Sequence, residues 1–110
     1  MSHSAPSVRS IPSLARFYAV LAEMYGNRLE RVVLYGSRAR GDAAVDSDYD
    51  IAIFLKDLGD RWAEADRIAV VATEILIETG DVIHAMPYPE GAYRERTPLM
   101  HEIRREGMDL

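Results

Sequence analysis

Apolar residues recur along the chain at spacings that alternate between those of helices and those of strands. Three segments carry apolar positions three and four residues apart, which predicts helices with one face against a core. They are 12–26, 61–79 and 93–106. Three shorter segments are rich in β-branched and aromatic residues and end at turn-forming residues, which predicts strands. They are 31–35, 49–56 and 81–86, and we expect Pro87–Pro89 to break the last of them.

This order of elements predicts an α/β or α+β domain, in which a small mixed sheet of about three strands packs against helices. The connection over 36–48 is too short for an ordinary helical crossover, so we expect the first two strands to be antiparallel. The helix over 61–79 permits a parallel crossover between the second and third strands. We expect residues 1–110 to form one domain, with the Ser- and Pro-rich residues 1–12 as a loose leader.

Composition narrows the classes of protein that fit this pattern. The formal net charge is −5, whereas nucleic-acid binding normally needs clustered basic residues, so we expect no direct nucleic-acid partner. The chain has no cysteine, which excludes disulfides, thiolate metal sites and cysteine nucleophiles. No segment approaches the ~20 apolar residues of a membrane span, and we expect a cytoplasmic protein. Because a domain this short buries a small share of its surface, it can also form a homo- or hetero-oligomer.

Acidic residues are concentrated before the second predicted strand. Asp48 and Asp50 stand two positions apart where this strand begins, so their side chains share a face, roughly 6–7 Å apart at the backbone. Two such carboxylates can converge on Mg2+ or Mn2+, which proteins usually hold with one or two carboxylates together with substrate phosphates. The preceding strand ends at Gly36 and Ser37, where the backbone and the hydroxyl can face phosphate oxygens.

Each of these features has a plainer interpretation. A Gly-Ser turn is usually just a turn, and a cluster of Asp residues is usually a solvated loop or a cap. A calcium loop fits Asp46, Asp48 and Asp50, but Ile51 stands where an EF-hand needs Gly and Asp57 where it needs the bidentate Glu. The combination of strand, Gly-Ser, about ten residues and Asp-x-Asp is what favours a nucleotide site.

The stretch LYGSRARGDAAVDSDYDIAIFL resembles the signature of the polymerase-β-like nucleotidyltransferase superfamily, in particular the minimal nucleotidyltransferases of bacteria and archaea. The order of elements extends the resemblance over about residues 14–107. The resemblance implies that Gly36, Ser37 and Arg38 bind a nucleoside triphosphate. It also implies that Asp48 and Asp50 hold metal that bridges its phosphates, while an acceptor hydroxyl attacks the α-phosphorus and releases pyrophosphate.

The superfamily commonly has a third carboxylate on a later strand, and the resemblance assigns this catalytic and metal-binding role to Asp81. Gly80 departs from the apolar residue that is more usual there, and a strand that begins only at Val82 would make Asp81 a turn residue. His84 follows Asp81 in the same predicted strand, where it contacts nucleotide or acceptor or, in the plainer interpretation, is a partly buried sheet residue. The arginines of the last predicted helix alternate with Glu95, Glu102 and Glu106, which favours a solvated, salt-bridged face.

Minimal members of this family commonly act with a helical HEPN-domain protein encoded nearby, a ribonuclease toxin that the transferase silences. The resemblance therefore implies transfer of AMP from ATP to a hydroxyl of such a toxin, with this chain as the antitoxin. Two alternatives remain open: an antitoxin that works by binding and masking its partner, and a transferase for a small molecule such as an aminoglycoside. An α/β domain with an acidic surface loop and no activity is the remaining interpretation.

Overall fold

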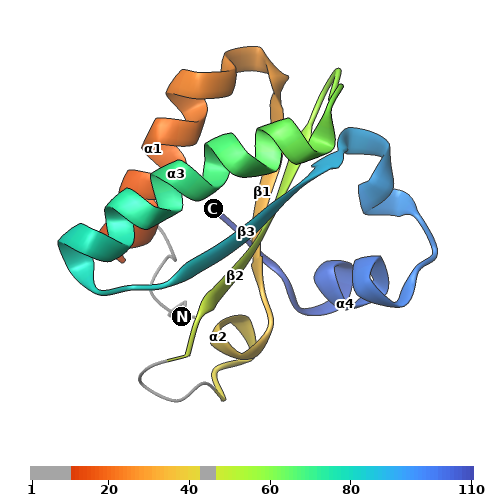
Figure 1. Ribbon diagram of the computed structural model, residues 1–110. Coiled ribbons are helices and arrows are strands. Elements are labelled where there is room, and N and C mark those ends of the chain that lie inside the picture. The colour runs from red at the N-terminus through yellow and green to blue at the C-terminus, as the bar shows by residue number, and fades with distance from the viewer. Residues whose placement is uncertain (1–10, 43–46) are drawn as a thin grey trace, which may run out of the picture.

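The computed structural model describes residues 11–42 and 47–110, which form a four-stranded sheet between helices (Figure 1). The helices are α1 (Pro12–Tyr25), α2 (Ser37–Arg40), α3 (Arg61–Thr79) and α4 (Pro98–Glu106), with 3-10 turns at Gly26–Arg28 (η2) and Glu90–Arg94 (η3). The strands are β1 (Leu29–Tyr35), β2 (Tyr49–Leu55), β3 (Ile83–Pro89) and β4 (Met108–Asp109). In these described ranges, no helix is both long enough and apolar enough to cross a membrane.

The sheet is mixed and has the strand order β3-β2-β1-β4. β1 is antiparallel to β2, and β2 is parallel to β3, with α3 as the crossover. Both orientations follow from connection length, because a short link returns the chain antiparallel and a helix is needed to bring it back parallel. The predicted fold class and both predicted pairings are confirmed.

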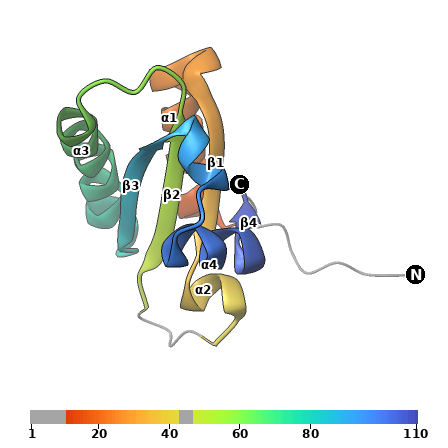
Figure 2. The same ribbon diagram turned by 90° about the vertical axis from the view of Figure 1, so that its right-hand side faces the viewer.

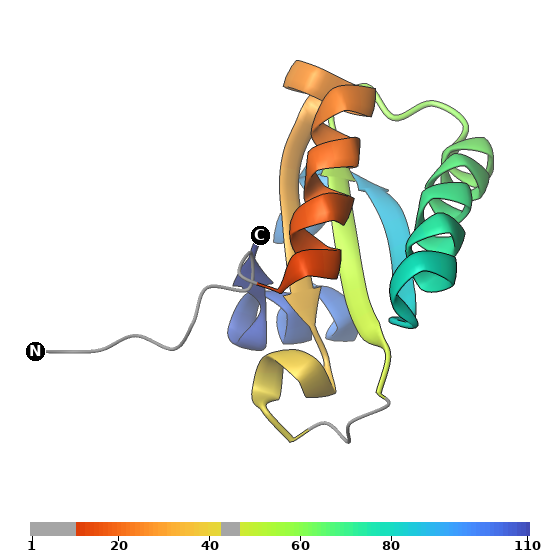
Figure 3. The same ribbon diagram turned by 90° about the vertical axis from the view of Figure 1, so that its left-hand side faces the viewer.

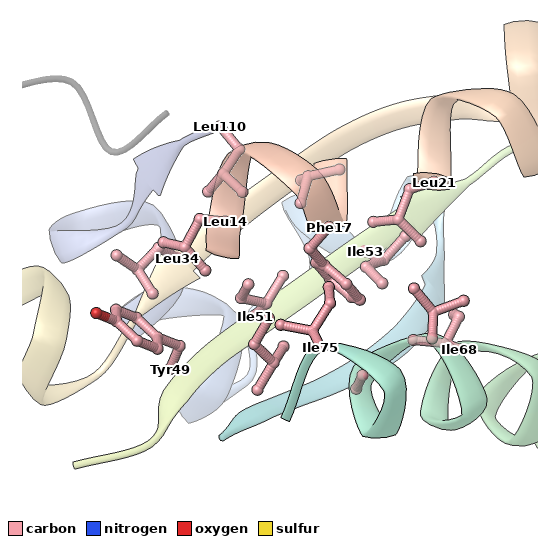
Figure 4. Close-up of a cluster of buried hydrophobic side chains, with 14 of the residues drawn as sticks. Leu14, Phe17, Leu21, Leu34, Tyr49, Ile51, Ile53, Ile68, Ile75 and Leu110 are labelled. Atoms are coloured by element: carbon pink, nitrogen blue, oxygen red, sulfur yellow. The ribbon is translucent and has the colours of Figure 1, made fainter. Parts of the chain in front are cut away.

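Two apolar layers hold the sheet, one on each face. α1 and α3 cover one face, where Phe17, Ile53 and Ile75 lie within a large buried cluster (Figure 4). α4 and η3 cover the other face around Phe54, whose ring stacks on Tyr88 at 5.7 Å between ring centroids. β2 is buried on both faces, as the strand at the centre of such a sandwich must be.

β3 runs through two prolines that we expected to end it. Tyr49 donates its backbone N–H to the carbonyl oxygen of Val82 at 2.9 Å, so alternate residues of β3 from Val82 onward face β2. The intervening positions, Pro87 and Pro89 among them, face the outer edge of the sheet, where a missing N–H breaks no bond to β2. The predicted break was therefore wrong, because each Pro falls on the outward-facing register.

The C-terminal segment differs from the single helix expected over 93–106. α4 begins at Pro98, where Thr97 accepts a hydrogen bond from the backbone N–H of Met100 at 3.1 Å as the N-cap. After α4, β4 pairs antiparallel with Val33 and Leu34 of β1, a strand that we did not predict. Its two residues are too few for alternation to be visible in the sequence. Residues 1–10 of the predicted leader lie outside the described residues.

Candidate active site

The Gly-Ser turn and the Asp-x-Asp strand meet at one end of the sheet. Antiparallel pairing places Tyr35, the last residue of β1, opposite Asp50 of β2. Gly36 follows with φ of 78°, and a Cβ built on it would lie 2.7 Å from the Oδ2 atom of Asp50. Any side chain at position 36 would therefore force the Asp50 carboxylate to move, so Gly36 serves both the conformation of the turn and the observed position of this carboxylate. Figure 2 shows α2 at this end, beside the start of β2.

Glu106, at the end of α4, accepts hydrogen bonds from two residues of the turn that follows β1. The backbone N–H of Gly36 donates to Glu106 Oε1 at 3.2 Å, and Arg40 Nη1 donates to the same oxygen at 3.0 Å. The Glu106 side chain is only 11% exposed. The sequence placed Glu106 on a solvated face, which was wrong, because α4 ends against β1 and brings this carboxylate to the turn.

Arg38 fixes the residues that lead into β2. Its Nε and Nη2 atoms donate to the carbonyl oxygen of Ser47 at 3.0 and 2.8 Å. Its guanidinium also lies over the ring of Tyr49, 4.4 Å from the centroid. These contacts hold Ser47 and Tyr49, the neighbours of Asp48, against α2. The role of Arg38 in nucleotide binding stays a prediction.

The two carboxylates of the motif differ in exposure. Asp48 precedes β2 and is exposed, whereas the side chain of Asp50 is 34% exposed and faces Gly36. Beside them, burial first, and then the charges of Tyr88, Asp50 and Glu102, raise the pKa of Tyr35 to about 12. Tyr35 therefore stays a neutral phenol at physiological pH. Asp46, which the calcium-loop interpretation used, lies outside the described residues.

Parallel register brings His84, and not Asp81, opposite Asp50. His84 Nδ1 lies 3.6 Å from Asp50 Oδ1, and its side chain is 67% exposed, so the interpretation of a partly buried sheet residue was wrong. Asp81 precedes β3 by two residues and donates its N–H to Thr79 Oγ1 at 3.1 Å. The strand start predicted at Asp81 was wrong as well, because the αL cap at Gly80 ends α3 and a short connection follows.

The carboxylates of Asp48 and Asp50 are too few to hold a metal ion by themselves, but they fit one that is also bound by a substrate. Across residues 11–42 and 47–110, no three His, Asp or Glu side chains are grouped so that they could hold a metal ion. Asp50 nevertheless offers carboxylate oxygens beside Gly36, and Asp48 is exposed two positions before it. Magnesium suits this arrangement, because it is usually bound by one or two carboxylates and completes its shell with phosphate oxygens and water. Asp81 as a third ligand stays a prediction.

Comparison with known proteins shows which family has this arrangement. The family model described as polymerase beta, nucleotidyltransferase, matches residues 21–107, which include the turn, the Asp-x-Asp strand and all of α3 and α4. The chain belongs to this nucleotidyltransferase family. The predicted family and the predicted enzyme class are thereby confirmed.

Individual relatives are consistent with the family match. This nucleotidyltransferase is 31% identical to a candidate protein adenylyltransferase of Methanocaldococcus jannaschii, over 76% of its own chain and 78% of the relative. Its fold is similar to that of a candidate minimal nucleotidyltransferase, with a TM-score of 0.59, 24% identity and coverage of 98% and 100% of the two chains. It is also similar in fold to a chain of a toxin-antitoxin structure with AMP-PNP, with a TM-score of 0.56, 20% identity and coverage of 86% and 69%.

Proposed function

We propose that this nucleotidyltransferase transfers AMP from ATP to a hydroxyl of a protein partner, with magnesium, and acts as the antitoxin of a HEPN-domain toxin. The observation that supports the proposal is the close approach of the Asp50 carboxylate to Gly36, which puts a candidate metal ligand beside the turn that we assign to the triphosphate. The name of the archaeal relative supports protein adenylylation. The toxin-antitoxin structure of similar fold, which contains AMP-PNP, supports a role beside a toxin and an adenine nucleotide as substrate.

In this proposal the chain positions its substrates more than it reacts with them. Ser37 binds the triphosphate, Gly36, whose N–H donates to Glu106, allows the triphosphate close approach, and Arg38 is a further contact. Asp48 and Asp50 hold magnesium, which when bound neutralises charge on the phosphates and on the leaving group. Manganese would fit the same carboxylate donors.

The reaction is an in-line displacement at phosphorus. The acceptor oxygen forms a bond to the α-phosphorus, the bond from that phosphorus to its bridging oxygen breaks, and pyrophosphate leaves with the electron pair. The hydroxyl proton passes to a base, the role that we assign to Asp81. His84, whose Nδ1 lies 3.6 Å from Asp50, stands on the surface that the acceptor must approach.

Neutralisation of the toxin in cells separates catalysis from binding. The proposed partner, a HEPN-domain toxin, is expressed with the wild-type chain or with the double variant Asp48→Asn, Asp50→Asn, at matched protein levels. We expect growth to be rescued by the wild type and lost with the double variant, because the chemistry needs both carboxylates. Rescue by the double variant would contradict an enzymatic antitoxin and favour one that masks its partner by binding.

A separate labelling experiment tests whether the acceptor is a small molecule. Labelled AMP transferred from α-labelled ATP to an aminoglycoside, with no protein acceptor present, would contradict the proposed protein substrate. The proposed location of the reaction is the cytoplasm, where the ATP and the toxin would be available.

A further inference from the structure

A groove runs between α3 and the outer edge of β3, on the far side of β3 from β2. It has a volume of about 420 Å3, and Trp62, Asp66 and Leu76 line its α3 side while Val82, Ala85 and Met86 line its β3 side. Trp62, Leu76 and Val82 are 67%, 40% and 40% exposed, which is unusual for large apolar side chains. Figure 2 shows β3 at the margin of the sheet beside α3, and Figure 3 shows the same pair from the opposite side.

The outer edge of β3 has backbone groups available for pairing with another strand only at the end nearest the candidate active site. The alternation set by the Tyr49–Val82 bond points the N–H and C=O groups of Ile83 and Ala85 outward, away from β2. In the described part of the chain, no strand pairs with this edge. Farther along, Pro87 has no N–H, and its carbonyl oxygen already accepts Arg61 Nε at 2.7 Å. A strand that added to this edge would therefore pair at Ile83 and Ala85 and stop there.

The charge of the groove indicates what kind of segment fits. Among the described residues that line it, Asp66 is the only Asp, Glu, Lys or Arg, and it is exposed. Asp81 precedes the groove's strand, Asp50 faces His84 at the end of the groove, and the whole chain has a net charge of −5. A second copy of this acidic chain would bring like charges together. A segment with basic residues is favoured instead.

We propose that the groove between α3 and β3 binds an extended, basic segment of the acceptor protein, which adds as a short strand to β3 at Ile83 and Ala85. Backbone hydrogen bonds to the edge would give affinity, while Trp62, Leu76 and Val82 would contact alternate side chains of the segment. One end of the docked segment reaches His84, the neighbour of Asp50, so the segment delivers its hydroxyl to the transfer site. This inference rests on the proposed function, since it names where that acceptor binds.

Binding of the purified HEPN-domain protein, measured by isothermal titration calorimetry without nucleotide, tests the groove directly. Ala85→Pro removes one outward N–H, and Pro87 shows that this register accepts proline without loss of the ladder to β2. Asp66→Lys reverses the groove's charge and needs no change in the backbone. Glu74→Lys is the matched control, because it makes the same charge change on the exposed surface of α3 but does not line the groove.

We expect Ala85→Pro and Asp66→Lys each to weaken binding by about tenfold, the loss of one good hydrogen bond or charge contact, and Glu74→Lys to leave it unchanged. Amide hydrogen exchange of Ala85 should also slow in the complex. The melting curve of Ala85→Pro shows whether this variant folds. If it does not, the affinity of Asp66→Lys and the amide exchange rate of Ala85 in the wild-type complex still test the inference. Full affinity in both groove variants, no protection of Ala85, or no complex with the wild type would overturn the inference. Groove-dependent binding without any AMP transfer would leave it standing and overturn the proposed function instead.

Discussion

The Oδ2 atom of Asp50 lies 2.7 Å from the position that a Cβ of Gly36 would occupy. This relationship ties the end of β1 to the start of β2, because antiparallel register places Tyr35 opposite Asp50 and the next residue must turn away. In the proposed function, this carboxylate would hold a cation against phosphates bound at the same turn. The Gly-Ser turn and the Asp-x-Asp strand would then depend on each other for nucleotide binding.

Replacing Gly36 with Ala should abolish most nucleotide binding. The new methyl would displace the Asp50 carboxylate, and φ of 78° with a side chain would cost about 1–3 kcal/mol of stability. Gly41→Ala is the control, because it has φ of 83° but nothing within 4 Å of its Cβ position. Calorimetric titration with magnesium and ATP should show a loss of affinity of at least about tenfold for Gly36→Ala alone. Equal affinities in the two variants would remove the steric argument.

Magnesium and ATP together should raise the melting temperature of the wild type. At about 100 times the dissociation constant, mass action adds about 2.7 kcal/mol, which is about 10 °C for a domain of this size. Asp48→Asn and Asp50→Asn should each lose most of this gain, since the metal loses a charged ligand. Asp42→Asn is the control, because Asp42 belongs to the same acidic stretch but pairs with Arg40. A full shift in Asp48→Asn would exclude it as a ligand.

Removing the cap of α3 should destabilise the fold without affecting the site. Asp60 accepts hydrogen bonds from the backbone N–H groups of Trp62 and Ala63, both at 3.1 Å. Asp60→Ala leaves these donors without a side-chain acceptor and should cost about 1 kcal/mol in urea unfolding. Asp60→Asn retains an acceptor oxygen and should recover most of the loss. No difference between the two variants would mean that the cap contributes nothing.

Stability should fall in strong alkali partly through Tyr25. Burial first, and then the hydrogen bond that Tyr25 donates to Glu64 at 2.6 Å, raise the pKa of this phenol above its ordinary value of 10.0. The folded state keeps the proton that the unfolded state releases, so this contribution is complete below pH 10 and decreases as the pH rises further. Tyr25→Phe should cost about 1 kcal/mol at pH 8 and show a shallower decline above pH 10 in urea unfolding. Parallel declines in the two proteins would contradict this assignment.

The sequence predicted those parts of the molecule that local pattern determines. Strand pairing directions followed from connection lengths, and α3 ended where Gly80 marked it. The strand that carries Asp50 was predicted from its apolar run and is β2, whereas Asp48 lies just before this strand and its shared face with Asp50 stays a prediction. Gly36 and Ser37 were predicted from their place after β1, and the structure brings Gly36 against Asp50. These relations involve neighbours in the chain or in one hairpin.

Other features depend on contacts between distant segments. His84 meets Asp50 because of the register between parallel strands, which a sequence does not display. Glu106 reaches Gly36 from 70 positions away, since α4 packs on β1 through its apolar face. The prolines of β3 were misjudged for the same reason, because whether a proline is tolerated depends on which residues face a neighbouring strand. In each of these cases, strand register or packing between distant segments determined the outcome, more than the local propensity of the residues did.

Transfer of label from α-labelled ATP to the HEPN-domain protein tests the central claim most directly. The purified wild-type chain, Asp48→Asn and Asp42→Asn are each incubated with magnesium, labelled ATP and the partner, and the products are separated on a gel and weighed by mass spectrometry. The account predicts AMP on the partner with the wild type and with Asp42→Asn, and none with Asp48→Asn. A tight complex that carries no label with any of the three, or label that persists in Asp48→Asn, would contradict it.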